Sequence, residues 1–204
     1  HTHLGQVLDH LCPDDMLKSV LVVEGYAILG SVQTDCGSRL QRPPDMQTLD
    51  GPFPAYRGFA PHVPVHCVTP GGGGYIHRYY DSSPFSPSGR YLALTRLPFE
   101  DRLPEPGDVA EIVVVDLETG ETRVVADTRG WDVQLGAQLQ WGADDHALLF
   151  NDLDTRDWVP FGVRLDPGSG VARRLGGTVY SVSPDGRWAA SPCLRRMAVT
   201  QRGY

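Results

Sequence analysis

Short apolar runs separated by polar turns dominate the chain from residue 75 onward. The clearest run, 111–116 (Glu-Ile-Val-Val-Val-Asp), is rich in β-branched residues and predicts a β-strand. A turn over 117–120 follows, in which Gly120 can take a positive φ, and the alternating residues 121–126 close a hairpin. Residues 91–96 predict an earlier strand of the same sheet.

The next stretch of the chain has the same order of strands and turns. Antiparallel units of four short strands are typical of β-propeller blades. The strands are expected over 137–141, 147–151, 161–165 and 171–175, with turns at 143–146 and 166–170.

One turn motif occurs three times. Ser-Pro-Ser-Gly-Arg at 86–90 returns as Ser-Pro-Asp-Gly-Arg at 183–187, and a degenerate copy lies at 141–150. A unit that recurs every roughly 40 to 55 residues indicates a repeat architecture and favours a propeller. The fold expected is therefore all-β: a partial β-propeller of about two and a half four-stranded antiparallel blades. The blades are expected at 82–127, 137–176 and, in part, 178–204.

Propellers usually close with about 4 to 8 blades, which leaves no long sheet edge exposed. We therefore expect this chain, which starts at His1 and not at Met, to be a piece of a longer protein. Sites in a propeller channel draw residues from several blades, so the chain is not expected to be active alone.

The first third of the chain has a different character. Residues 1–74 are rich in Pro and Gly and keep no regular apolar period, which predicts an irregular, poorly ordered leading segment before a domain at 75–204. The apolar run 17–29 predicts one strand or helix. Acidic residues in and before that run argue against a signal peptide, and no run reaches the roughly 20 apolar residues of a membrane span.

Charge and cysteine content exclude some functions. The net charge of −7 is spread along the chain, which argues against binding to nucleic acid but allows a polyanion held by a few arginines. The cysteines show no Cys-x-x-Cys spacing, so no zinc site is expected. Unpaired thiols are favoured over one disulfide among the first three. The four residues are Cys12, Cys36, Cys67 and Cys193.

Residues 151–157 look like a calcium loop, but they lack the glycine and the closing glutamate of an EF-hand. The interpretation preferred for them is a solvated acidic loop.

The segment 75–85 carries the first group of candidate catalytic residues. His77 or Tyr80 could move a proton, and Arg78 could hold a carboxylate in a bidentate pair. The alternative is that the aromatic residues pack between blades, His77 caps a loop and Arg78 stacks on neighbouring tyrosines.

The segment 130–141 occupies the corresponding place in the second blade. Trp131, Gln134 and Gln138 are candidate substrate-binding residues, because glutamine hydrogen-bonds sugar hydroxyls and tryptophan stacks on pyranose rings. Strand alternation predicts that Gln138 and Gln140 share one face. The alternative is that this pair faces solvent while Trp141 fills the core between blades.

The turn at 183–187 and the strand pair at 113–122 resemble the Tol-type propeller repeat. Residues 77–84 and 131–141, together with 200–204 (Thr-Gln-Arg-Gly-Tyr), also resemble propeller polysaccharide lyases of the oligogalacturonate and ulvan lyase type. This second resemblance extends over about residues 75 to 204.

The resemblance implies a secreted protein, periplasmic or extracellular, that cleaves an acidic oligo- or polysaccharide by β-elimination. It implies that His77 transfers the proton, that Tyr80 is its partner and that Arg78 neutralises the uronate carboxylate. Oligogalacturonate lyases also hold a divalent cation, Mn or Ca, with a histidine cluster and a glutamine. The sequence shows no such cluster, so that site is expected either in blades missing from this chain or not at all in this relative.

A second hypothesis is a non-catalytic propeller that binds a protein or glycan. Convergence of His77, Arg78 and Tyr80 on one cavity would favour the lyase, and their packing between blades would favour the binding module. A third hypothesis, a propeller attached to a hydrolase, would need a Gly-x-Ser-x-Gly element, which is absent from the sequence.

Overall fold

The computed structural model describes residues 20–23, 26–29, 52–55, 65–71, 73–79, 82–193 and 196. Its elements are all strands. The chain divides into two compact units, the first formed by residues 1–72 and 118–120 and the second by 73–117 and 121–204. The sequence predicts that residues 1–74 are poorly ordered. Most of these residues lie outside the described ranges, so this stays a prediction.

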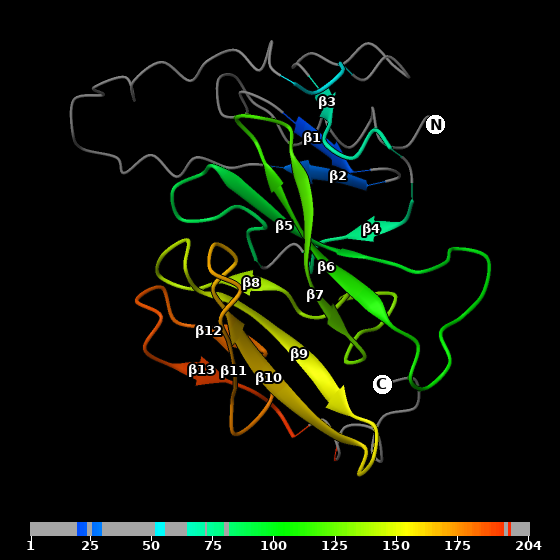
Figure 1. The fold of residues 1–204 in the computed structure, drawn as a ribbon, viewed down its shortest axis with the longest axis vertical. Helices are drawn as coiled ribbons and strands as arrows, with labels where there is room; N and C mark the ends of the chain where they lie inside the picture. Colours follow the sequence, from blue (N-terminus) through cyan, green and yellow to red (C-terminus); the bar gives the residue numbers. More distant parts are fainter. Residues whose placement is uncertain are drawn as a thin grey trace. The chain divides into compact units, whose positions relative to one another are not determined.

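The first unit contains a three-stranded sheet of β1 (Val20–Val23), β2 (Tyr26–Leu29) and β3 (Val65–Cys67) in the order β2-β1-β3 (Figure 1). β1 pairs antiparallel with β2 and parallel with β3. The prediction of one strand or helix over 17–29 is wrong, because this stretch contains two paired strands, β1 and β2.

The second unit begins with a four-stranded antiparallel sheet (green in Figure 1). Its strands β5, β6 and β7 confirm the predictions at 91–96, 111–116 and 121–126, although β7 runs two residues further than expected. Gly120 in the β6–β7 turn has the predicted positive φ, 78°. The strands, in sheet order, are β4 (Tyr75–Ile76), β5 (Tyr91–Arg96), β6 (Ala110–Asp116) and β7 (Thr122–Thr128).

A second four-stranded antiparallel sheet follows with the same consecutive order. The strands predicted at 147–151, 161–165 and 171–175 are confirmed, but the strand predicted over 137–141 shrinks to its last two residues. The cause is Gln138, whose φ of 55° departs from extended geometry. The strands are β8 (Gln140–Trp141), β9 (Leu148–Asp154), β10 (Val159–Leu165) and β11 (Ala172–Arg174).

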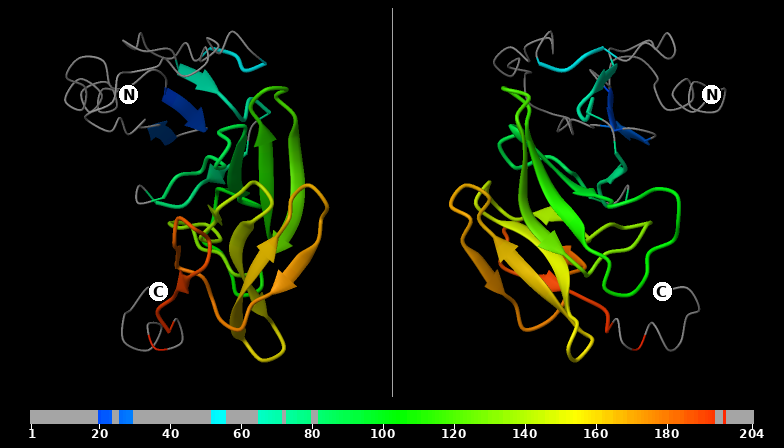
Figure 2. Two further views of the ribbon diagram at one scale, coloured as in Figure 1. Left: turned by 90° about the vertical axis from the view of Figure 1, so that its left-hand side faces the viewer. Right: turned by 45° about the vertical axis from the view of Figure 1, so that its right-hand side comes forward.

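A third pair of strands, β12 (Ser181–Val182) and β13 (Ala189–Ala190), forms a two-stranded antiparallel sheet. The second unit is therefore all-β and built from antiparallel sheets that succeed one another along the chain (Figure 2). No helix long and apolar enough for a bilayer span occurs in the part of the chain that the structure describes.

The apolar core lies between the two four-stranded sheets. One cluster of buried side chains joins β5 and β6 of the first sheet to β9 and β10 of the second, so the sheets pack face to face. The cluster contains Ala93, Ile112, Val114, Ala137, Leu139, Leu148, Phe150, Val163 and Leu165.

The three copies of the turn motif share one hydrogen bond. The first residue of each turn donates its N–H to a carbonyl at the start of the following strand: Ser86 to Tyr91 (2.8 Å), Gly142 to Ala147 (2.7 Å) and Ser183 to Trp188 (2.9 Å). The repeat predicted from the sequence is thus present as equivalent backbone geometry, and it defines corresponding positions in the three sheets.

Candidate functional site

Residues from all three sheets of the second unit meet around Tyr180. The guanidinium carbon of Arg78 lies 4.7 Å from the centre of the Tyr180 ring. Gln140 Nε2 donates to the Tyr180 carbonyl (3.2 Å), and Gln140 Oε1 accepts from the Val182 N–H (3.0 Å). We call this region, formed by residues 78, 137–140 and 179–182, the first-strand junction, because each segment lies next to or within the first strand of its sheet: residue 78 follows β4, while 137–140 and 179–182 lead into β8 and β12.

Two polar side chains hold the backbone of the first-strand junction in place. Thr95 Oγ1 accepts from the Ala137 N–H (3.1 Å). Asn151 accepts from the Val179 N–H (2.7 Å) and donates to the Val179 carbonyl (2.9 Å). Its side-chain amide thus forms the two hydrogen bonds that the backbone of a neighbouring β-strand would form. Thr95 and Asn151 stand at corresponding positions of their repeats, equally far from Ser86 and Gly142. Each sheet is therefore tied to the next by an equivalent side chain.

Gln138 is the most unusual residue of the first-strand junction. It has a φ of 55°, a conformation that costs energy for a residue with a side chain. The residue is only 8% exposed, yet its Oε1 has no hydrogen-bond partner among the described residues. A buried carbonyl oxygen of this kind requires an explanation, because an unsatisfied polar group destabilises the fold.

The structure places two of the three predicted catalytic residues. His77 follows β4 and is half-buried, whereas Arg78 is buried, at 4% exposure. The alternative, in which Arg78 stacks on the neighbouring tyrosines, stays a prediction, because the ring under its guanidinium is that of Tyr180 and Tyr80 lies outside the described residues. Tyr80 lies outside the described residues, so the expected convergence of the three side chains stays a prediction.

Trp131 and Gln134 lie apart from these contacts. Trp131 donates from Nε1 to the Asp108 carbonyl (2.8 Å) and packs against Phe99, with ring centres 6.0 Å apart. The side chain of Gln134 is exposed. Among the described residues, neither Trp131 nor Gln134 hydrogen-bonds or stacks with Arg78 or Gln138, so the site assembled here contains only part of the predicted set.

The expectation that Gln138 and Gln140 lie on one face of a regular strand is wrong. Both side chains are buried, at 8% exposure, and the backbone turns at Gln138. The alternative, in which the pair faces solvent, is wrong for the same reason. Sequence reasoning missed Asn151 and Tyr180 as partners in the junction. The match between Asn151 and Thr95 in the repeat was the signal that could have revealed the first of these.

The residues described here do not fit the divalent cation that the resemblance implies. The described part of the chain contains no group of three histidine, cysteine or acidic side chains arranged to hold a metal. The thiols of Cys67, half-buried, and Cys193, exposed, are free. Cys12 and Cys36 lie outside the described residues.

Comparisons with models of protein families, with curated proteins and with solved structures find no match to this chain.

Proposed function

We propose that the second unit is part of a β-propeller, in which the two four-stranded sheets are blades and β12 with β13 begins a third. Three features support this proposal: the consecutive strand order, the equivalent turns and the equivalent side-chain ties at Thr95 and Asn151. In a propeller the first strands of successive blades line the central channel. The first-strand junction would then lie at that channel.

We further propose that the first-strand junction binds an acidic oligo- or polysaccharide without cleaving it. The observation that carries the proposal is Gln138, a buried amide in a strained conformation whose Oε1 has no partner among the described residues. Strain of this kind collects at binding sites, and a sugar hydroxyl would complete the hydrogen bonding of the amide.

The environment of Arg78 favours binding over β-elimination. A residue that neutralises the reacting carboxylate must contact it directly in the transition state. Arg78 is nearly buried and its guanidinium lies over the Tyr180 ring, which fixes the cation inside the junction.

Cleavage by a propeller polysaccharide lyase remains the second candidate function. It is favoured by the position of His77, a half-buried imidazole next to the buried Arg78 in the chain. In that case His77 would transfer the proton, with Tyr80 as its partner. Both proposals place the protein in the periplasm or outside the cell, where such polymers occur.

The binding proposal is tested by isothermal titration of the 204-residue chain with oligogalacturonate. Gln138→Ala is expected to weaken binding by about tenfold, the usual effect of losing one or two hydrogen bonds. Val133→Ala, which shortens an exposed side chain in the same segment, is the matched control and should bind as the parent does. Equal affinity for all three proteins would refute the proposal.

The same samples distinguish binding from cleavage. β-Elimination creates an unsaturated uronate that absorbs in the ultraviolet, so a rise in absorbance that disappears in His77→Ala would favour the lyase. Binding with constant absorbance would favour the module only if it is repeated with the longer protein that the sequence leads us to expect, because a lyase site needs residues from several blades.

A further inference from the structure

β13, the second strand of the third sheet, has an open edge among the described residues. In each four-stranded sheet the second strand lies between two others: β5 between β4 and β6, and β9 between β8 and β10. In the described part of the chain the third sheet contains only β12 and β13. The edge of β13 that corresponds to the one covered by β6 or β10 therefore has no neighbouring strand there.

The repeats show which backbone groups this edge presents. The equivalent hydrogen bonds of the three turns make Ala189 the counterpart of Leu92 and Leu148. Leu92 pairs with Val115 of β6, and Leu148 pairs with Leu165 of β10. Backbone groups alternate in direction along a strand, and the residue before Ala189 uses its carbonyl on the β12 side. The N–H and C=O of Ala189 therefore point to the open edge.

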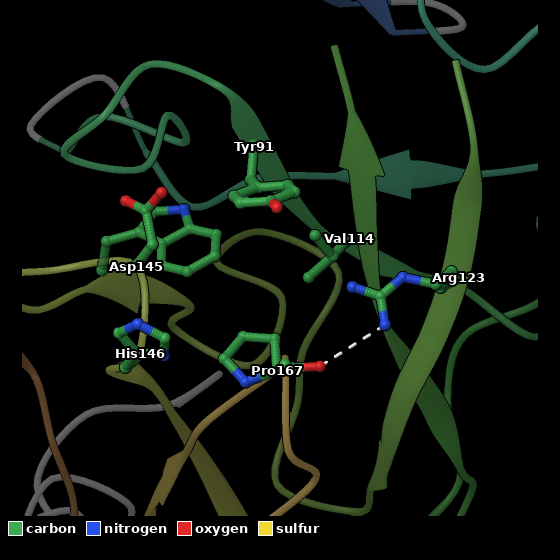
Figure 3. Close-up of a pocket in the computed structure, with 8 residues that line it drawn as sticks. Tyr91, Val114, Arg123, Asp145, His146 and Pro167 are labelled. Atoms are coloured by element: carbon green, nitrogen blue, oxygen red, sulfur yellow. Dashed lines mark hydrogen bonds between the residues drawn. The ribbon is translucent and has the colours of Figure 1, made fainter. Parts of the chain in front are cut away.

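A contact with a carboxylate marks the same place in both four-stranded sheets. Arg90, at the end of the first turn, contacts Asp116 at the end of β6 (2.7 Å). His146, at the corresponding position of the second repeat, lies 3.4 Å from Asp166, which directly follows β10. Figure 3 shows the His146 ring beside Pro167, the next residue after Asp166. The third strand of each sheet thus ends in a carboxylate that meets the end of the turn.

Arg187 is the counterpart of Arg90 in the third repeat. Its side chain is exposed and has no carboxylate partner among the described residues. Asp185, in the same turn, accepts from the Ser183 hydroxyl (2.6 Å) and from the backbone N–H of Arg187 (3.0 Å). Trp188, next to Arg187, is 74% exposed. The open edge therefore combines free backbone groups, an apolar ring and a guanidinium without a carboxylate.

We propose that the open edge of β13 binds an extended segment of a partner polypeptide in which an apolar residue is followed by an acidic one. The segment pairs antiparallel with β13, with its apolar residue opposite Ala189 and its carboxylate on Arg187. Addition of a strand to a free sheet edge is an established mode of peptide recognition. β6 and β10, which make these contacts in the other sheets, are already paired on both sides, so a second copy of this chain cannot supply either of them.

The proposal rests on the part of the proposed function in which β12 and β13 begin a third blade, and it does not require glycan binding. The two failures are distinguishable. Titration with oligogalacturonate reports on the first-strand junction, whereas titration with a peptide reports on β13 and Arg187.

The test is a fluorescence anisotropy titration of the 204-residue chain into a labelled, C-terminally amidated peptide with the sequence of residues 159–166, Val-Pro-Phe-Gly-Val-Arg-Leu-Asp. Saturable binding is expected. The peptide with Asp166→Asn should bind about two- to fivefold more weakly, the usual effect of a partly exposed ion pair. The peptide N-methylated at Leu165 lacks the N–H that faces Ala189 and should bind about tenfold more weakly. No saturable binding, or binding that neither change weakens, would overturn the proposal.

Two variants of the chain assign the effect to Arg187. Arg187→Gln should bind the Asp and Asn peptides equally, whereas Arg173→Gln, which removes an exposed arginine from β11, should keep the preference for Asp. A preference that survives in Arg187→Gln would contradict the proposal. Thermal unfolding checks both variants, and the peptide series on the parent chain decides if Arg187→Gln does not fold.

Sedimentation velocity of the parent chain alone tests the competing occupant. A monomer is expected. A dimer that dissociates in Arg187→Gln would identify a second copy of the chain as the occupant of the edge and would overturn the proposal.

Discussion

Gln138 differs from the glycines of positive φ in the repeated turns, and, unlike Trp158 (φ 53°), it is buried. Gly89 and Gly186 have φ values of 77° and 67° in tight turns, where glycine adopts this conformation at little cost. Gln138 carries a full side chain at 55° and also buries an amide oxygen that lacks a partner among the described residues. Two unfavourable features at one residue indicate a role other than stability.

Replacement of Gln138 by glycine should make the protein more stable. Relief of the left-handed backbone and loss of the unsatisfied amide outweigh the added flexibility of the unfolded chain, so the free energy of unfolding should rise by about 1 kcal/mol. Urea denaturation measures the change. Gln138→Ala keeps the backbone strain and is the control, which should gain less. A large loss of stability in Gln138→Gly would show that the side chain has a structural role.

Asp166 should contribute stability that depends on pH. Hydrogen bonds from the Ser169 hydroxyl and the Gly168 N–H lower the pKa of Asp166 from 3.8 to about 2. Because the pKa is depressed in the folded state, the contribution is complete above pH 3.8 and is lost as the pH falls toward 2. Unfolding in urea at a series of acidic pH values should therefore show a shallower pH dependence for Asp166→Asn than for the parent. Identical dependence would contradict this assignment.

Individual site residues were only partly predictable from the sequence. Arg78 and Gln138 were identified as candidates because folding alone rarely selects an arginine or glutamine at such positions. Their partner Tyr180 lies roughly a hundred residues away along the chain from Arg78, and local patterns contain no information about that contact. The positive φ of Gln138 was equally hidden, because glutamine is not a residue that signals a left-handed backbone.

At the scale of elements, the ties between sheets depend on Thr95 and Asn151. Both lie in the second strand of their sheet or at its end, and both reach the backbone that precedes or begins the next first strand. Threonine supplies one hydrogen bond to this backbone, while asparagine supplies two. The tie between the second and third sheets should therefore be the more sensitive to mutation.

Replacement of Asn151 by alanine should lower the free energy of unfolding by about 3 kcal/mol, because the buried N–H and C=O of Val179 both lose their partner. Thr95→Val, which leaves one N–H unsatisfied, should cost about 1 to 2 kcal/mol. Chemical denaturation gives both values. If Thr95→Val lowered the free energy of unfolding more than Asn151→Ala does, the two side chains would not have equivalent roles.

The strands themselves were largely predictable. β5, β6, β9 and β10 are runs of apolar and β-branched residues bounded by Gly, Pro, Asp and Ser, and their bounds differ from expectation by few residues. The first strands were not predictable in detail. β4, β8 and β12 have two residues each, and side-chain hydrogen bonds from the preceding sheet hold the backbone at or just before β8 and β12.

For the whole molecule, burial is unequal among the three sheets of the second unit. The central strands β5 and β6 are buried on both faces, whereas β13 is exposed and Trp188 beside it has 74% of its surface accessible. A two-stranded sheet with little apolar burial is marginally stable in water. The third sheet should consequently open more readily than the other two.

Hydrogen exchange followed by mass spectrometry tests this difference. Peptides that cover β12 and β13 should exchange orders of magnitude faster than peptides that cover β5 and β6, since local opening needs less energy where few apolar contacts are lost. Peptides from β9 and β10 provide an internal control with strong protection. Equal protection of the third sheet would mean that it is held by contacts beyond those described.

The corresponding position of the third repeat is occupied by Pro192. The proline side chain has neither a hydroxyl nor an amide group. It therefore cannot form the hydrogen bond to a following segment that Thr95 and Asn151 form. Duplicating residues 137–178 within the chain would instead add a second asparagine equivalent to Asn151, with the same two hydrogen bonds to the backbone of the segment that follows it. In a chain lengthened in this way, each added sheet should pack against the next in the same arrangement, as in repeat proteins built from identical repeats.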